Sequence, residues 1–295
     1  MLLKNLIKNI PKAKRNTFIS GIASNSKEVK KNYIFFATKG NKINGEKFIE
    51  EAIKRGASVI ICSKQCKLTN KNVLIFKTKN IRYLLSEISS KFYKLKPKNI
   101  IAVTGTNGKT SVADLFYQIL RINKIPAATI GTLGLKYNGR IIKTKLTSPD
   151  TISLHNYLYF LKKKKIDNVI IESSSHGLDQ KRLHHISFKG AIFTNFSQDH
   201  LDYHKNMKSY LSAKFILFRE ILEKKRTIIT DKEIKEFSLI KKISKKKGFK
   251  LLDISDEINN IKYELPDYTS DFKIRNLAMA IKATKLCGLK DKIIY

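Results

Sequence analysis

The chain has 295 residues, with 59 Lys and Arg against 24 Asp and Glu, and a formal net charge of +35. This length favours two domains over one, and a hydrophobic content of 42% is enough for packed cores, which excludes a wholly disordered chain. Such a charge could attract nucleic acid, or it could steer small anionic substrates. Most of the excess is lysine scattered through every segment, whereas arginine is preferred for reading bases, so we expect no nucleic-acid partner.

The cysteines and the first residues of the chain indicate the cellular compartment in which the protein is expected to work. Cys62, Cys66 and Cys287 fit a reducing environment, and no second Cys or His pair accompanies Cys62 and Cys66 to complete a zinc site. Residues 1–15 are basic without an apolar core, so they do not resemble a secretion signal. No segment approaches the roughly 20 apolar residues that span a bilayer. We therefore expect a cytoplasmic protein without membrane insertion.

The first third of the chain alternates short apolar runs with helical patterns. Its pattern predicts strands at 33–37, 59–62 and 73–76, and helices at 48–55 and 81–93. These elements form a small α/β domain over residues 1–95. The segment 94–98, which contains Pro97, is the expected linker to a second domain at 96–295.

The second part repeats the alternation more strongly. A β-branched run at 100–103 leads into a glycine-containing loop, and apolar residues at helical spacing follow it over 112–120. Further strands are expected at 169–171 and 191–194, and a long helix at 207–222. Continuous apolar strands between helices predict an α/β domain with a mostly parallel sheet flanked by helices.

The loop Gly105-Thr106-Asn107-Gly108-Lys109-Thr110-Ser111 lies between a predicted strand and a predicted helix. Glycines let backbone N–H groups turn toward one point, and the helix N-terminus favours an anion. Lys109 can then neutralise phosphates, and the Thr110 hydroxyl can face Mg²⁺, so we predict ATP binding. The strict Walker pattern has Gly where this chain has Val103, and a glycine-rich turn with an incidental lysine is the alternative.

Glu172, His200 and Lys214, which all follow the loop in the chain, extend the prediction of a phosphate site. Glu172 follows the strand at 169–171, where a carboxylate can hold Mg²⁺ against phosphates, although such a glutamate can also be a salt-bridging or capping residue. His200 lies in a polar loop and can ligate a second ion once adjacent acids orient its ring. Lys214 lies on the helix after that loop, where a lone lysine is ordinarily surface charge.

Together these segments resemble the Mur ligase family. The segments GTNGKTS (105–111), ESSSHGLDQKR (172–182), FTNFSQDHLDYH (193–204) and SAKFILF (212–218) follow one another in the family's order. Within the family, the second segment is most similar to the branch that adds the third residue of the peptidoglycan stem peptide. The resemblance extends into the first domain, at 25–27 and 33–40.

The resemblance implies roles for individual residues. Lys109, Glu172, His200 and Lys214 are the catalytic set, and Thr110, Glu172, His200 and a carbamylated Lys214 are the metal ligands. The loop 105–111 and Asn276 bind ATP, although Ser270 and Lys273 depart from the family's adenine-side pattern. The implied residues for the UDP-muramoyl dipeptide are Ser26, Asn41, Lys42, Thr147, Ser148, Ser174, Gln180 and Arg182.

The implied reaction is ATP-dependent amide formation. The D-glutamate of UDP-N-acetylmuramoyl-L-Ala-D-Glu is activated as an acyl phosphate and receives a diamino acid, by default meso-diaminopimelate. Members of the family carry a third, acceptor-binding domain that this sequence is expected to lack, so a separate chain could supply it. The alternatives are a non-catalytic remnant that binds nucleotide or precursor, and another ligase of the superfamily such as a folylpolyglutamate synthetase.

Overall fold

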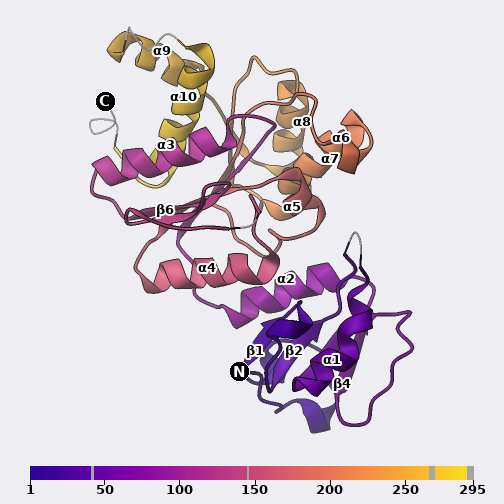
Figure 1. Ribbon diagram of the computed structural model, residues 1–295. Helices are drawn as coiled ribbons and strands as arrows, with labels where there is room; N and C mark the ends of the chain where they lie inside the picture. The colour runs from indigo at the N-terminus through magenta and orange to yellow at the C-terminus, as the bar shows by residue number, and fades with distance from the viewer. Residues whose placement is uncertain (41–42, 145, 266–269, 291–295) are drawn as a thin grey trace. The chain divides into compact units, whose positions relative to one another are not determined.

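The computed structural model describes residues 1–40, 43–144, 146–265 and 270–290 (Figure 1). The predicted substrate-binding residues Asn41 and Lys42 lie outside these residues. Contacts divide the chain into two compact units. One consists of Met1–Lys94 with Thr151–Asn156, and the other of Leu95–Asp150 with Tyr157–Tyr295.

The first unit is a parallel α/β unit. Its described strands form one sheet in the order β1-β2-β3-β4. The elements are β1 (Gly21–Ala23), β2 (Tyr33–Phe36), α1 (Ile49–Lys54), β3 (Ala57–Ser63), β4 (Leu74–Thr78) and α2 (Ile81–Phe92). The central strand β3 is buried on both faces, because Val59 and Ile61 pack with α2 while Ile60 and Cys62 pack with α1. The strands and helices predicted here are present, and the short β1 is an addition.

The second unit contains a larger sheet. Its described strands have the order β12-β11-β10-β5-β9-β6-β7-β8, and all neighbours are parallel except the pairs β6–β7 and β7–β8. The strands are β5 (Asn99–Thr104), β6 (Ala127–Gly131), β7 (Gly134–Tyr137), β8 (Arg140–Ile142), β9 (Asn168–Glu172), β10 (Gly190–Phe193), β11 (Thr227–Thr230) and β12 (Lys250–Asp253).

Helices cover the larger sheet. The helices of this unit are α3 (Lys109–Ile122), α4 (Thr151–Lys163), α5 (Ser175–Asp179), α6 (Leu201–His204), α7 (Met207–Ile216), α8 (Phe237–Lys247), α9 (Ser255–Glu264) and α10 (Asp271–Leu286), except that the first residues of α4, Thr151–Asn156, belong to the first unit. Helices α3 and α10 lie side by side on one face of the sheet, with α4 on the other side of β6 (Figure 1). Phe116 of α3 and Ile281 of α10 share a buried core with Val103 of β5. The predicted α/β class, with a mostly parallel sheet flanked by helices, is confirmed.

The helix predicted at 207–222 has a different form near its end. It is α-helical through α7 and then widens into a π-helical segment, Leu217–Ile221. Phe218 in that segment packs against Phe193 and Phe215, with ring centroids 6.1 and 5.6 Å apart. Such a widening is found frequently at functional sites, and this one follows Lys214 within one turn.

The order of the strands determines where polar loops meet. Strand β5 lies between β9 and β10, and β9 also borders β6. The carboxyl ends of neighbouring parallel strands lie at one edge of the sheet, where such folds bind ligands. Within the described residues, no helix is long and apolar enough to cross a membrane.

Candidate functional site

The glycine-rich loop between β5 and α3 is held by its neighbours. Gly105 and Gly108 have φ angles of +146° and +82°, and a Cβ on Gly105 would lie 1.9 Å from Thr194 Oγ1. Only glycine suits these two positions. The Thr194 hydroxyl donates to the Asn107 carbonyl at 2.6 Å, and Asn107 N–H donates to Asn195 Oδ1 at 2.9 Å. The segment after β10 therefore fixes the loop that precedes α3.

Two lysines converge on this loop, the half-buried Lys109 and the buried Lys214. Lys109 Nζ donates to the carbonyls of Gly105 and Thr106 at 2.9 and 2.6 Å. Lys214 Nζ donates to the same Gly105 carbonyl at 2.7 Å and lies 4.3 Å from the ring centroid of Tyr210. Burial lowers the pKa of both ammonium groups, and the nearby Lys109 charge contributes further at Lys214, where the pKa falls to about 7. Lys214 is 1% exposed, so it is not surface charge.

Glu172, the last residue of β9, receives hydrogen bonds from two sides. The Thr110 hydroxyl donates to Oε2 at 2.8 Å, which ties the carboxylate to the start of α3. From the loop after β6, Thr132 N–H donates to Oε1 at 2.9 Å and the Thr132 hydroxyl to Oε2 at 3.1 Å. Glu172 is 2% exposed, so these groups supply the polar surroundings that a buried carboxylate needs. Sequence reasoning placed Glu172 here and missed Thr132.

The oxygen atoms near the loop suit a hard divalent cation. Thr110 Oγ1 and the Glu172 carboxylate lie together, and Mg²⁺ prefers such oxygen ligands combined with phosphates and water. No group of three or more His, Cys, Asp or Glu side chains that could hold a metal occurs among the residues that the structure describes. The residues fit an ion that shares its coordination with a phosphate ligand rather than an all-protein cage.

A cavity of about 260 Å³ brings most of the predicted set together. It is lined by Thr106, Asn107, Gly108, Lys109, Thr110, Ser111, Thr132, Thr147, Glu172, Ser174, Ser175, His200 and Lys214. The same cavity is therefore lined by two lysines, a carboxylate and several hydroxyl groups. This combination can bind a polyphosphate and place a second polar ligand beside it.

His200 lies on this cavity in a left-handed conformation, with φ of +51°. Its Nε2 is 3.4 Å from Asp199 Oδ2, so an acid lies beside the ring; that this acid orients the ring stays a prediction. The ring of His176 lies 4.9 Å from that of His200, and burial, followed by the neighbouring His200, lowers the pKa of His176. The buried His204 is hydrogen-bonded to Ser175 Oγ at 2.9 Å. His176 and His204 were missed in the sequence because a histidine's neighbours depend on the fold.

Four of the residues predicted for the precursor are joined by hydrogen bonds. Ser148 Oγ donates to the Glu172 carbonyl at 2.8 Å and accepts from Ser174 N–H at 2.9 Å. Arg182 donates to the Ser148 carbonyl at 2.7 Å and to Gln180 Oε1 at 2.6 Å. Ser148 is 1% exposed, so its hydroxyl stabilises the loop, whereas Thr147 beside it faces the cavity.

Ser26 lies in the first unit, apart from this cluster in the chain. It begins a short 3₁₀ helix, Ser26–Glu28, and is 5% exposed. Its hydroxyl donates to Glu51 Oε2 at 2.7 Å, an interaction that lowers the pKa of Glu51. In this structure the Ser26 hydroxyl therefore stabilises the junction of the 3₁₀ helix and α1. Its predicted contact with a uridine nucleotide stays a prediction.

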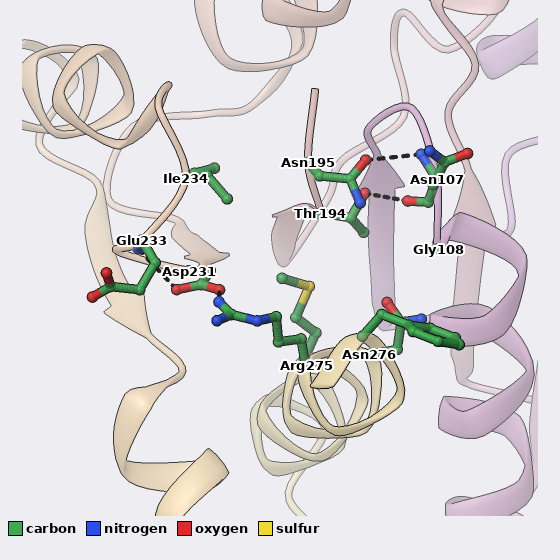
Figure 2. A pocket seen from close by; sticks show the side chains of 11 residues that line it. Asn107, Gly108, Thr194, Asn195, Asp231, Glu233, Ile234, Arg275 and Asn276 are labelled. Atoms are coloured by element: carbon green, nitrogen blue, oxygen red, sulfur yellow. Dashed lines mark hydrogen bonds and ion pairs between the residues drawn. The ribbon is translucent and has the colours of Figure 1, made fainter. Parts of the chain in front are cut away.

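A second cavity, of about 530 Å³, shares Asn107 and Gly108 with the first (Figure 2). Asn107, Gly108 and Asn276 of α10 are among its lining residues, and Asn276 packs directly against the loop, since a Cβ on Gly108 would meet Asn276 Oδ1 at 2.5 Å. Arg275 reaches from α10 to the buried Asp231, just after β11, and forms an ion pair with it (Figure 2). Asn276 was predicted here, whereas Asp231 and Arg275 were missed because the adenine-side pattern does not specify position 275 and the segment after β11 carries no recognisable motif.

The strand–loop–helix unit at the edge of a mostly parallel sheet defines an α/β protein of the P-loop class. The sequence matches the Mur ligase middle domain over residues 103–287 and the description "Mur ligase family, catalytic domain" over residues 18–93. The chain belongs to the Mur ligase family. The predicted family is thereby confirmed.

Curated relatives include proteins named UDP-N-acetylmuramoyl-L-alanyl-D-glutamate--2,6-diaminopimelate ligase. The protein from Brucella melitensis is 40% identical over 206 residues, which cover 70% of this chain and 42% of the relative. The protein from Wigglesworthia glossinidia brevipalpis is 39% identical over 273 residues, covering 90% and 52%. The chain thus spans about half the length of the curated relatives it matches.

Among solved structures, one carrying the same ligase name superposes with a TM-score of 0.82 at 23% identity. The superposition covers 100% of this chain and 65% of that one. At this identity the likeness shows the fold alone.

Proposed function

We propose that this chain carries the nucleotide- and precursor-binding residues of an ATP-dependent amide ligase of peptidoglycan synthesis. The reaction joins a diamino acid, by default meso-diaminopimelate, to the D-glutamate of UDP-N-acetylmuramoyl-L-Ala-D-Glu. The observation that carries the proposal is the single cavity in which the phosphate loop, Glu172 and Thr147 meet. The names of the relatives support the substrate class, and such precursors are made in the cytoplasm.

The phosphate loop would bind the ATP tail. Backbone N–H groups of the loop and the N-terminus of α3 favour negative charge, and Lys109 is already within the cavity. Lys109 bonds loop carbonyls, which it can exchange for phosphate oxygens at little structural cost. Thr110 and Glu172 would hold Mg²⁺, which supplies charge neutralisation at the transferred phosphoryl group.

Lys214 would act as a modified residue. Because only a neutral amine attacks CO₂, a pKa of about 7 leaves a large neutral fraction at cytoplasmic pH. Carbamylation forms an N–C bond and releases one proton, converting the amine into a carboxylate that points at the loop. This exchange of positive for negative charge beside Lys109 removes the repulsion between the two ammonium groups and adds an oxygen ligand near the cation.

The acyl donor would approach from the hydroxyl side of the cavity. Thr147, Ser174 and Arg182 lie on that side, and an arginine is suited to orienting a carboxylate. The substrate carboxylate attacks the γ-phosphorus in line, forming an acyl phosphate and ADP. An amine then attacks the acyl carbon, loses a proton and displaces inorganic phosphate, so that an amide remains.

The test combines binding and turnover on the full chain. Calorimetry would measure Mg²⁺–AMPPNP and UDP-N-acetylmuramoyl-L-Ala-D-Glu separately; we expect Lys109→Met to remove nucleotide binding and Arg182→Ala to weaken precursor binding at least about tenfold. Lys208→Met, an exposed lysine on α7, is the matched control. Phosphate release with bicarbonate and diaminopimelate measures turnover. A chain that binds nucleotide but shows no affinity for the precursor would overturn the proposal.

A further inference from the structure

Thr132, the first residue after β6, contacts both halves of the cavity. Its N–H donates to Glu172 Oε1 at 2.9 Å, and its hydroxyl is 3.1 Å from Glu172 Oε2. The same hydroxyl is 3.2 Å from Thr147 Oγ1. Glu172 lies beside the phosphate loop through Thr110, and Thr147 lies on the side proposed for the precursor. The Thr132 hydroxyl thus joins the Glu172 carboxylate to the Thr147 side chain.

A threonine hydroxyl has a single proton, so it donates to one strong acceptor at a time. Without ligands, the ionised Oε2 is the better acceptor, because hydrogen bonds to charged oxygens are about twice as strong as those between neutral groups. The Thr147 hydroxyl then receives no proton from Thr132. A positive charge at Oε2 would draw electron density from that oxygen and weaken it as an acceptor, which frees the Thr132 proton to turn to Thr147.

We propose that Thr132 is a positioning residue that couples the two sides of the cavity through this shared proton. When Glu172 is engaged on the nucleotide side, the Thr132 hydroxyl donates to Thr147, and the proton of Thr147 is directed at the acyl donor. Hydrogen bonds in such a row strengthen one another. The inference rests on the proposed function, since it takes the ligand beside Thr147 to be the precursor.

The coupling has a thermodynamic signature. If nucleotide occupancy improves precursor binding by some factor, precursor occupancy improves nucleotide binding by the same factor. A hydrogen bond gained by a partly exposed hydroxyl corresponds to about a three- to tenfold change in affinity. Coupling should disappear when the divalent cation is withheld, because phosphate alone does not engage the Glu172 carboxylate.

Two substitutions at Thr132 distinguish the effect of the hydroxyl proton from the effect of side-chain size. Thr132→Val keeps the size and the backbone N–H donor to Glu172 while it removes the hydroxyl. Thr132→Ser restores the hydroxyl. Thr144→Val is the matched control, because it removes a hydroxyl that lies within donating distance of the Gly131 and Leu146 carbonyls, at 3.3 and 3.2 Å, and is not hydrogen-bonded to Glu172.

The experiment is calorimetry of UDP-N-acetylmuramoyl-L-Ala-D-Glu with the full chain, alone, with Mg²⁺–AMPPNP, and with AMPPNP plus EDTA. We expect the wild type, Thr132→Ser and Thr144→Val to bind the precursor about three- to tenfold more tightly with Mg²⁺–AMPPNP only. Thr132→Val should bind each ligand within about threefold of wild type yet show a coupling factor near one.

The outcomes separate the two proposals. Retained coupling in Thr132→Val, or coupling lost equally in Thr132→Ser, overturns the role of the shared proton. A wild type that binds both ligands without coupling overturns it as well and leaves the proposed function standing. A wild type that does not bind the precursor overturns the proposed function together with the inference.

Discussion

The carboxylate of Glu172 occupies the space directly above Gly131, where a Cβ would lie 2.0 Å from Glu172 Oε1. Gly131 does not have a positive φ, so alanine is allowed by its backbone and the obstacle is the carboxylate alone. Glycine at the end of β6 is therefore the residue that lets Glu172 reach both Thr110 and Thr132.

Gly131→Ala should displace the Glu172 side chain. We expect Mg²⁺-dependent nucleotide affinity to fall at least about tenfold, which calorimetry would measure, with a loss of about 1–3 kcal/mol in unfolding free energy from crowding. Gly190→Ala is the control, since its Cβ would press on Leu286 and Thr227 at the other end of the sheet. Equal nucleotide affinity in Gly131→Ala and wild type would contradict the placement of Glu172.

Alanine substitutions at the adjacent residues Thr147 and Ser148 should affect different properties, precursor binding at Thr147 and stability at Ser148. Ser148→Ala leaves the Ser174 N–H and the Glu172 carbonyl without their buried partner, so we expect a loss of about 1–3 kcal/mol in unfolding free energy by urea denaturation. Thr147→Ala should change stability by less than about 0.5 kcal/mol and instead weaken precursor binding. The assignment fails if Ser148→Ala is as stable as wild type.

The Asp231–Arg275 ion pair should matter mainly for stability. The Asp231 side chain is 2% exposed, so Arg275→Ala would leave a buried carboxylate without its cation, at a cost of about 2–4 kcal/mol in unfolding free energy. Adding Asp231→Asn should recover part of this loss, because the uncompensated charge is removed. Asp271→Asn, which alters the exposed partner of Arg275, should cost less than about 0.5 kcal/mol. A fully additive double variant in chemical denaturation would refute charge compensation.

The lowered pKa of Lys214 predicts that the unfolding free energy depends on pH. Its folded pKa of about 7 lies below the ordinary lysine value, so between pH 7 and about 10.5 the unfolded chain binds a proton that the native chain has released. This lysine therefore makes unfolding free energy rise with pH through that window, and its destabilising effect is complete below pH 7. Lys214→Met should remove on the order of 1–3 kcal/mol of that rise, measured by denaturation at pH 6.5 and 9 without bicarbonate. Lys208→Met should keep the wild-type slope, and a Lys214→Met slope equal to wild type would contradict the lowered pKa.

Much of the fold could be predicted because its signals are local. The strand, glycine loop and helix around 105–111 follow one another in sequence, and the carboxyl ends of parallel strands share one edge. That rule is sufficient to place Glu172 beside the loop, and the structure brings Lys214 and His200 to the same cavity. The family match confirms the resemblance from which their roles were inferred, while the roles themselves stay predictions.

Other features depend on contacts that sequence spacing does not reveal. The contact of Thr132 with Glu172 can be predicted only when β6 is known to lie beside β9. The ion pair of Arg275 can be predicted only when α10 is known to face the residue after β11. The widening of α7 at Leu217–Ile221 accompanies packing among three phenylalanines from two elements, which no single helical pattern encodes. The inward hydrogen bonds of the Ser148 hydroxyl could not be read from the motif, which records that a hydroxyl is present and not which way it points; its predicted contact with the precursor stays a prediction.

Strand β9 is only five residues long, yet Val103 and Gly131 flank its last residue from two other strands. Because side chains alternate between faces, deletion of one residue within β9 would turn Glu172 to the opposite face while the apolar run still paired. Such a variant would keep a buried sheet and lose the carboxylate at the cavity. Tolerance to insertions and deletions should therefore be lowest in this strand. The register in which β9 pairs determines whether Glu172 reaches the cavity at all.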